Sequence, residues 1–139
     1  MCIRDSYISV KATDNAENES TTITSDGVIV DTDGPIAGTV LDGTDVDIDW
    51  TNSTSSLTAT WSGFSDTLSG IQKYEYAIGT EIDSFSLVNW TSTDLDTFFI
   101  ESDLTLISSE TYFVFVKATD HVSNIGNISA SDGIMVEND

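Results

Sequence analysis

The sequence predicts an all-β chain, a sandwich of seven short strands preceded by a β-hairpin. Three observations lead to this prediction. Apolar residues alternate with polar ones over short stretches, turn-rich segments separate these stretches, and no segment carries the 3.6-residue period of a helix. Alternation with a period of two places one face of each strand against a core and the other toward solvent. Seven such strands in about 100 residues are typical of two packed sheets.

An internal repeat indicates how the strands are grouped. Val10-Lys11-Ala12-Thr13-Asp14 recurs as Val116-Lys117-Ala118-Thr119-Asp120, which is an offset of 106 residues. At the same offset, Ser25-Asp26-Gly27 recurs as Ser131-Asp132-Gly133. A repeat of this length is too long for a solenoid unit and fits one sandwich domain.

The repeat divides the chain into three segments. Residues 1–6 resemble the translation of a transposon-end adaptor used in sequencing libraries, so we leave them out of the fold argument. Residues 7–33 are expected to be the last two strands of a truncated upstream domain. Residues 34–139 are expected to be a complete second domain, and Asp33-Gly34-Pro35 marks the junction because Gly-Pro pairs interrupt regular structure. The chain is therefore expected to be truncated at both ends.

Three rows of alternating residues give the strongest strand signals in the second domain. They begin at Leu57, Tyr74 and Tyr112. Weaker strands are predicted at 37–41, 86–89, 98–101 and 134–137. The predicted core consists of Leu57, Ala59, Trp61, Tyr74, Tyr76, Leu106, Tyr112, Val114 and Val116.

Several of these motifs resemble the fibronectin type III family. Leu57-x-Ala59-x-Trp61 is similar to its second strand, and Ile71-x-x-Tyr74-x-Tyr76 to its third. The segment from Leu106 to Tyr112, followed by alternating apolar residues, resembles its tyrosine corner and sixth strand. The resemblance implies an immunoglobulin-like sandwich in which the Tyr112 hydroxyl bonds to backbone near Leu106. The chain departs from the family at Ser108-Ser109, where a Pro-Gly pair is usual.

A narrower resemblance concerns the context of the domain. Trp61-Ser62-Gly63-Phe64-Ser65-Asp66, followed by Ser69-Gly70-Ile71, is similar to tandem repeats in large bacterial surface proteins. This resemblance implies an extracellular or cell-surface protein with several domains in tandem. The fold itself does not specify a function, because this sandwich hosts many.

The charge of the chain excludes some partners. Four Lys and Arg residues face 24 Asp and Glu residues, which gives a formal net charge of −20. Nucleic acid and anionic membrane surfaces require a basic patch, and so few basic residues cannot supply one. No apolar run reaches the roughly 18 residues of a membrane helix. The expected partners are neighbouring domains of the same chain and a protein or carbohydrate ligand.

The sequence does not predict an enzyme. His121 is the single histidine, and it follows a predicted strand as a loop residue. Cys2, the single cysteine, lies in the adaptor-like segment, which argues against a cysteine nucleophile or a thiolate metal site. Carboxylate pairs carry no signal here, because 24 acidic residues will always supply some pair at a suitable spacing.

Two aromatic residues are candidates for a surface contact. If Tyr112, Val114 and Val116 face the core, then Phe113 and Phe115 face outward on a central strand. Exposed aromatic rings can stack on sugars or contact a protein partner. The alternative is that neighbouring side chains, such as Met135 or the aliphatic stem of Lys73, cover both rings.

A calcium site is predicted at the junction between the two domains. Asp31 and Asp33 lie in the linker, and Asp66 and Asp120 lie in loops at the near end of the second domain. Calcium takes six to eight oxygen ligands, so backbone carbonyls and water would complete the shell. The alternative is that Asp66 caps its own turn and the linker acids are solvated. No other cofactor is expected.

The leading functional hypothesis is a non-catalytic spacer and adhesion module in a secreted or cell-surface, bacterial, multidomain protein. The rival hypothesis is an accessory module of a secreted polysaccharide-degrading enzyme whose catalytic domain lies outside this chain. A third is a structural array stiffened by metal ions. The neighbouring domains of the full reading frame would distinguish the first two.

Overall fold

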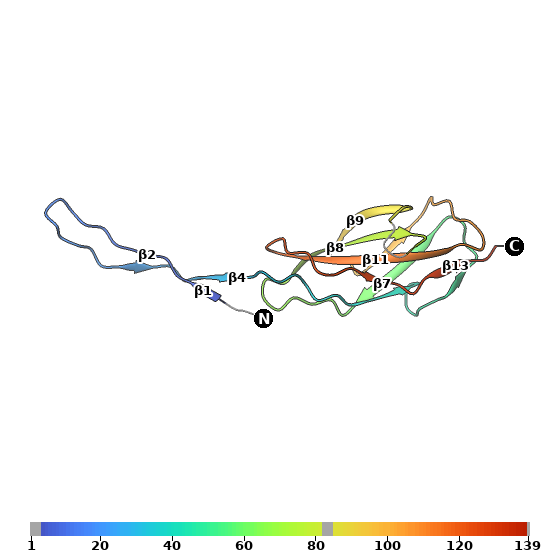
Figure 1. The fold of residues 1–139 in the computed structure, drawn as a ribbon, viewed down its shortest axis with the longest axis horizontal. Coiled ribbons are helices and arrows are strands. Elements are labelled where there is room, and N and C mark those ends of the chain that lie inside the picture. The colour runs from blue at the N-terminus through green and yellow to red at the C-terminus, as the bar shows by residue number, and fades with distance from the viewer. Residues whose placement is uncertain (1–3, 82–84, 139) are drawn as a thin grey trace. The chain divides into compact units, whose positions relative to one another are not determined.

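The computed structural model describes residues 4–81 and 85–138 and divides the chain into two units (Figure 1). Unit 1 comprises Met1–Asp33 and unit 2 comprises Gly34–Asp139. The described residues form strands, turns and loops and contain no helix. The all-β prediction is therefore confirmed.

Unit 1 is a two-stranded hairpin made of two paired segments. β1 (Arg4–Ser6) pairs antiparallel with β4 (Val28–Val30), and β2 (Ser9–Val10) pairs antiparallel with β3 (Ile23–Thr24). The side chains of β2, β3 and β4 are exposed, because no further strands among the described residues of unit 1 pack against the hairpin. The predicted hairpin is confirmed. Its pairing extends back to residues 4–6 of the adaptor-like segment, and residues 1–3 lie outside the described residues.

Unit 2 contains two sheets. The smaller sheet has the strand order β10 (Phe98–Glu101), β7 (Leu57–Ser62) and β5 (Thr39–Asp42), all antiparallel. The larger sheet has the order β6 (Trp50–Thr51), β13 (Ile134–Val136), β11 (Thr111–Asp120), β8 (Ile71–Gly79) and β9 (Val88–Asp94). β12 (Ser129–Ala130) also pairs with β11.

The first and last strands of unit 2 are both interrupted. The chain leaves the smaller sheet at the end of β5 and joins the larger sheet as β6, which pairs parallel with β13. The last strand is divided into β12 and β13, which pair with successive parts of β11. The segment 43–49 between β5 and β6, here called the crossover loop, therefore passes along the sandwich edge where first and last strands meet.

Most strand predictions are close to the observed bounds. Residues 98–101 match β10, and the other three weak predictions are shifted or differ in length by one to a few residues. The nine predicted core residues are all buried, with exposed fractions of 9% or less. The predicted register is thus correct, since a shift of one residue would have reversed every facing.

The side chain of Tyr112 forms the hydrogen bond that the resemblance implies. Its hydroxyl accepts a bond from the Ile107 N–H at 3.0 Å, next to Leu106. We expect Tyr112→Phe to lower the free energy of unfolding by about 1 kcal/mol, because one partly buried hydrogen bond is lost. Urea unfolding measures this, with the exposed Tyr7→Phe as control. An unchanged midpoint for Tyr112→Phe would remove the role of this hydroxyl.

The turn before β11 contains a strained serine. Ser109 has a φ of 72°, a left-handed conformation that glycine adopts without a Cβ clash. Its N–H donates to the Val136 carbonyl at 2.7 Å, which a substitution of the side chain leaves in place. We expect Ser109→Gly to raise the free energy of unfolding by about 0.5–1 kcal/mol. A decrease in the thermal unfolding midpoint would show that the serine side chain itself stabilises the turn.

Candidate functional site

His121 joins two loops of unit 2. It follows the last residue of β11, as the sequence predicts for a loop residue, and its side chain is exposed. Its Nδ1 lies 2.9 Å from the Ser69 carbonyl oxygen and 3.0 Å from the Gly70 carbonyl oxygen. Two carbonyl neighbours require this nitrogen to be the donor, so the imidazole serves as a structural link between the two loops.

Phe115 lies on the face of β11 opposite the core, as predicted, but it is not available for a surface contact, because neighbouring side chains cover it, as the alternative proposed. Phe115 is completely buried, and its ring packs edge-to-face against Phe85 at a centroid distance of 5.1 Å. Phe85 also contacts Trp90. The Lys117 ammonium lies over the Trp90 ring, 4.2 Å from its centroid. Phe85 and Trp90 therefore lie over this face of the sheet, and strand alternation alone does not reveal such a cover.

Phe113 is half-buried and keeps part of its surface in solvent. Its ring lies over Gly133, where an added Cβ would come within 2.8 Å of Cε1. Gly133 has a φ of 101°, so both its conformation and this close approach favour glycine. A contact of Phe113 with a ligand stays a prediction, but a paired aromatic surface with Phe115 does not form.

Asp120 holds the loop that follows β11. Its Oδ1 accepts hydrogen bonds from the N–H groups of Val122 and Asn124, both at 2.9 Å, and its Oδ2 accepts one from Asn124 Nδ2 at 2.9 Å. Its side chain is completely buried. Burial alone would raise the pKa of Asp120, but the hydrogen bonds from Asn124 and Val122 outweigh it and lower that pKa.

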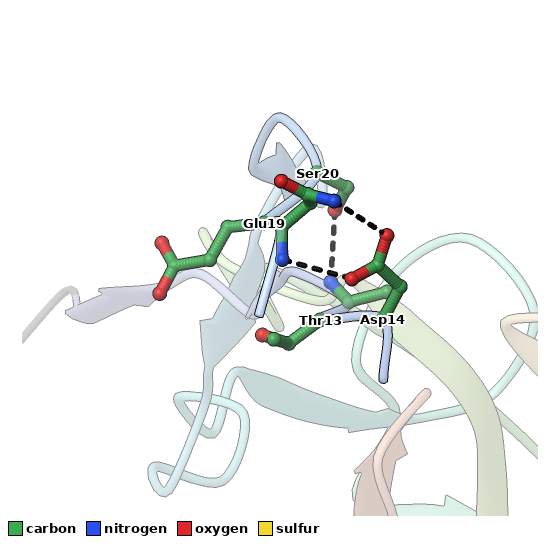
Figure 2. Close-up of a pocket in the computed structure, with 6 residues that line it drawn as sticks. Thr13, Asp14, Glu19 and Ser20 are labelled. Atoms are coloured by element: carbon green, nitrogen blue, oxygen red, sulfur yellow. Dashed lines mark hydrogen bonds between the residues drawn. The ribbon is translucent and has the colours of Figure 1, made fainter. Parts of the chain in front are cut away.

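Unit 1 contains the same arrangement at Asp14, 106 residues earlier. Oδ1 of Asp14 accepts from the N–H groups of Ala16 and Asn18, and its Oδ2 accepts from Asn18 Nδ2 at 3.0 Å. Figure 2 shows this loop, in which Thr13, Asp14, Glu19 and Ser20 line an open hollow and dashed lines mark its hydrogen bonds. The polar groups of the hollow bond largely to one another, so the geometry indicates a structural loop.

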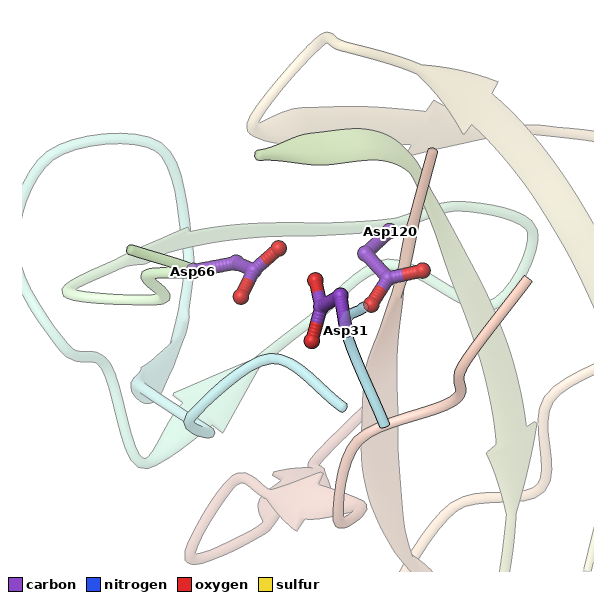
Figure 3. Close-up of side chains that lie close together, drawn as sticks. All are labelled: Asp31, Asp66 and Asp120. Atoms are coloured by element: carbon purple, nitrogen blue, oxygen red, sulfur yellow. The ribbon is translucent and has the colours of Figure 1, made fainter. Parts of the chain in front are cut away.

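Two acids of the predicted junction site lie close together within unit 2. A carboxylate oxygen of Asp66 and one of Asp120 are within 4.8 Å of each other (Figure 3). Asp66 also accepts a hydrogen bond from the Ser69 hydroxyl at 3.1 Å. Asp31 and Asp33 belong to unit 1, and the Asp33 N–H donates to Asp31 Oδ1 at 3.2 Å. A calcium ion bound by all four stays a prediction.

A second acidic cluster lies wholly within unit 2 and was missed by the sequence reasoning. Asp42 is the last residue of β5, Asp47 lies in the crossover loop, and Asp132 lies between β12 and β13. One carboxylate oxygen from each lies within 4.8 Å of the others. The Asp47 Oδ1 also accepts a hydrogen bond from the Asp42 N–H at 3.0 Å, which fixes Asp47 beside Asp42.

The Asp42 carboxyl group is buried without a hydrogen-bond partner. Its side chain has an exposed fraction of 0%, and neither oxygen accepts a hydrogen bond from any residue that the structure describes. Burial, with the nearby Asp47 and Asp132 carboxylates, raises the pKa of Asp42 to about 7. The Ser131 hydroxyl and Gly133 N–H act in the opposite direction, but neither reaches normal hydrogen-bond geometry.

The sequence contained a weak signal for this cluster. Asp42-Gly43 and Asp132-Gly133 are both Asp-Gly pairs, and both glycines have a φ above 100°. Asp-Gly pairs are typical of turns, so the pairs by themselves predict turns and not ligands. The two pairs are 90 positions apart, and the crossing of the chain between sheets is what brings them together.

Comparison with known proteins gives the fold but no function. No family model matches the chain, and no curated protein sequence matches it. Among solved structures, the FN1–FN3 domains of chicken CNTN1 match 75% of this chain at 20% identity with a TM-score of 0.51. This chain covers 33% of that structure. The human cardiac titin module A71 is 19% identical, with 79% of this chain and 97% of the module covered and a TM-score of 0.48.

The fold of unit 2 can now be assigned. It has two antiparallel-rich sheets, a buried tryptophan on the central strand of the smaller sheet, and a tyrosine hydroxyl bonded to backbone before β11. These features agree with the resemblance in sequence and with the match to the CNTN1 domains. No helix among the described residues is long and apolar enough to cross a membrane. By its fold, unit 2 is a fibronectin type III-like domain.

Proposed function

We propose that the chain is a non-catalytic spacer and adhesion module from a tandem array of such domains in an extracellular, bacterial protein. The observation that carries the proposal is the repetition of local structure at an offset of 106 residues. The Asp14 and Asp120 loops share the same three side-chain hydrogen bonds. A chain that repeats one domain is suited to setting distance between its ends.

The repetition extends beyond these two loops. In unit 1, the Ser25 N–H donates to the Ile8 carbonyl, and the Ile8 N–H donates to Ser25 Oγ. In unit 2, the Ser131 N–H donates to the Val114 carbonyl, and the Val114 N–H donates to Ser131 Oγ. The distances in the two copies agree, at 2.8 Å for the first bond and 3.0 Å for the second. This match supports residues 7–33 being the last two strands of an upstream copy.

The acidic surface is consistent with such a role. A net charge of −20 keeps neighbouring copies from associating side by side, because like-charged surfaces repel one another. The match in fold to the FN1–FN3 domains of CNTN1 supports a non-catalytic module.

A length series tests the spacer function. Proteins with one, two and four copies of residues 34–139 in tandem would be examined by small-angle X-ray scattering. A spacer predicts a maximum dimension that rises by the same increment for each added copy. Collapse into a particle whose dimension does not follow copy number would contradict the proposal. Retention of beads coated with the four-copy protein on glycans and host proteins would test adhesion separately.

A further inference from the structure

We propose that Asp42, Asp47 and Asp132 form a divalent-cation site, with calcium as the preferred ion, at the edge of unit 2. The site differs from the predicted junction site in all of its residues, and it does not depend on the proposed spacer function. The ion would tie the crossover loop after β5 to the break between β12 and β13, so that one ligand set spans the first and last strands of the domain.

Among the described residues of unit 2, Asp42 and Asp120 are both fully buried aspartates, and their surroundings differ. Asp120 is surrounded by three hydrogen-bond donors that satisfy its charge. Asp42 is buried to the same degree and accepts no hydrogen bond from the described residues. A buried carboxylate without a donor is strongly disfavoured unless a proton or a cation neutralises it.

The neighbours of Asp42 favour a cation over a proton. A protonated carboxyl group can share its proton with one neighbouring carboxylate only, yet Asp47 and Asp132 each bring an oxygen within 4.8 Å, whereas a cation can bind all three. Their charges repel one another at this distance. The ion pairs between side chains of the described residues are Lys11–Glu19 and Lys73–Glu75, so no lysine neutralises the cluster.

The ligand atoms of the three side chains indicate which kind of ion the site would bind. All three side chains offer only oxygen, which suits a hard cation better than zinc, whose sites are built mainly from cysteine and histidine. Three oxygens within 4.8 Å of one another can contact a single ion. Calcium is preferred because it accepts six to eight oxygens in an irregular arrangement, as loops of a protein supply them. Magnesium requires a stricter octahedron. Loop carbonyls and water would supply the remaining ligands.

The existence of the site does not require the tandem array proposed above, but its mechanical role does. In that array, the site would act on the strands that carry tension. β5 is the first strand of unit 2, and β13 is the last. In a tandem chain, force enters and leaves each domain through these terminal strands. A cation held by both would resist the separation of β5 and its crossover loop from the β12–β13 break.

Thermal unfolding of the full chain with and without calcium tests the proposal. After treatment with EDTA at pH 7.5, addition of about 10 mM calcium is expected to raise the unfolding midpoint by roughly 5–15 °C, given the millimolar affinities of extracellular modules. The same concentration of magnesium is expected to give a clearly smaller shift. No shift with calcium would overturn the proposal and would leave Asp42 as a protonated acid.

The Asp42→Asn variant gives the sharpest result, because its two expected effects have opposite signs. In EDTA its midpoint should equal or exceed that of the unmodified chain, since the buried charge is gone. Its response to calcium should be lost. A lower midpoint in EDTA together with a full calcium response would overturn the assignment of Asp42 as a ligand.

Three further variants identify the site. In Asp47→Asn, calcium should no longer raise the unfolding midpoint. Because Asp47 is exposed, this variant should fold even if Asp42→Asn does not, and it then tests the site in its place. The exposed Asp96→Asn removes one charge outside the cluster and should keep the shift. Asp66→Asn should keep it as well. Loss of the shift in Asp66→Asn alone would place the calcium at the junction and overturn this site.

Discussion

Replacement of Trp61 by alanine is expected to lower the free energy of unfolding of unit 2 by about 3–5 kcal/mol. Trp61 lies on β7, between β5 and β10, with an exposed fraction of 3%. Its ring contacts Tyr74 edge-to-face at a centroid distance of 5.9 Å and Phe99 at 6.4 Å, so alanine would leave a cavity in the core. Since small domains are stable by only about 5–15 kcal/mol, this loss approaches the whole stability.

Two other tryptophan variants sharpen this test. Trp50→Ala removes a ring that is 58% exposed, so its effect in EDTA should stay within about 0.5 kcal/mol. Trp61→Phe should cost clearly less than Trp61→Ala. It keeps an aromatic ring in the core, and it removes an indole N–H that is buried without a hydrogen-bond partner among the described residues. Urea unfolding followed by circular dichroism measures all three. Equal losses for Trp50→Ala and Trp61→Ala would contradict the packing role of Trp61.

The fold could be predicted because its signals are local. The alternation around Leu57 and Tyr112 identifies strands and their buried faces without knowledge of their partners. The hydroxyl bond of Tyr112 could be predicted from a short motif for the same reason. The short strand β6 was not predicted, since a two-residue strand has no period and forms only where β13 offers a free edge.

The candidate sites depend on contacts that local patterns do not contain. Alternation correctly places Phe115 on the face of β11 opposite the core, yet the ring is buried because Phe85 folds over it. Asp42 has the sequence environment of an ordinary turn residue, and its burial follows from the passage of the chain between sheets. A sequence with many acidic residues contains many possible sets of three carboxylates, and only the tertiary structure shows which of them lie close together.

The hydrogen bonds of Asp120 lead to the last large effect. Asp120→Ala is expected to lower the free energy of unfolding of unit 2 by about 2–3 kcal/mol, because three donors in the loop lose their buried acceptor. Asp14→Ala is the matched control, since it removes the same set of bonds in unit 1. Asp14 is exposed, so water can replace its carboxylate, and the unfolding of unit 2 should not change.

The pH dependence of the Asp120→Ala effect provides a second measure. Hydrogen bonds lower the pKa of Asp120 below its ordinary value of 3.8 in the folded state. The stabilisation is therefore complete above this value and is lost as the pH falls through the folded pKa. In EDTA, the difference in unfolding free energy between the unmodified chain and Asp120→Ala should be constant from pH 5 to 8 and should shrink below about pH 4. A difference that persists unchanged at pH 2 would show that the side chain stabilises the loop by packing rather than by its charge.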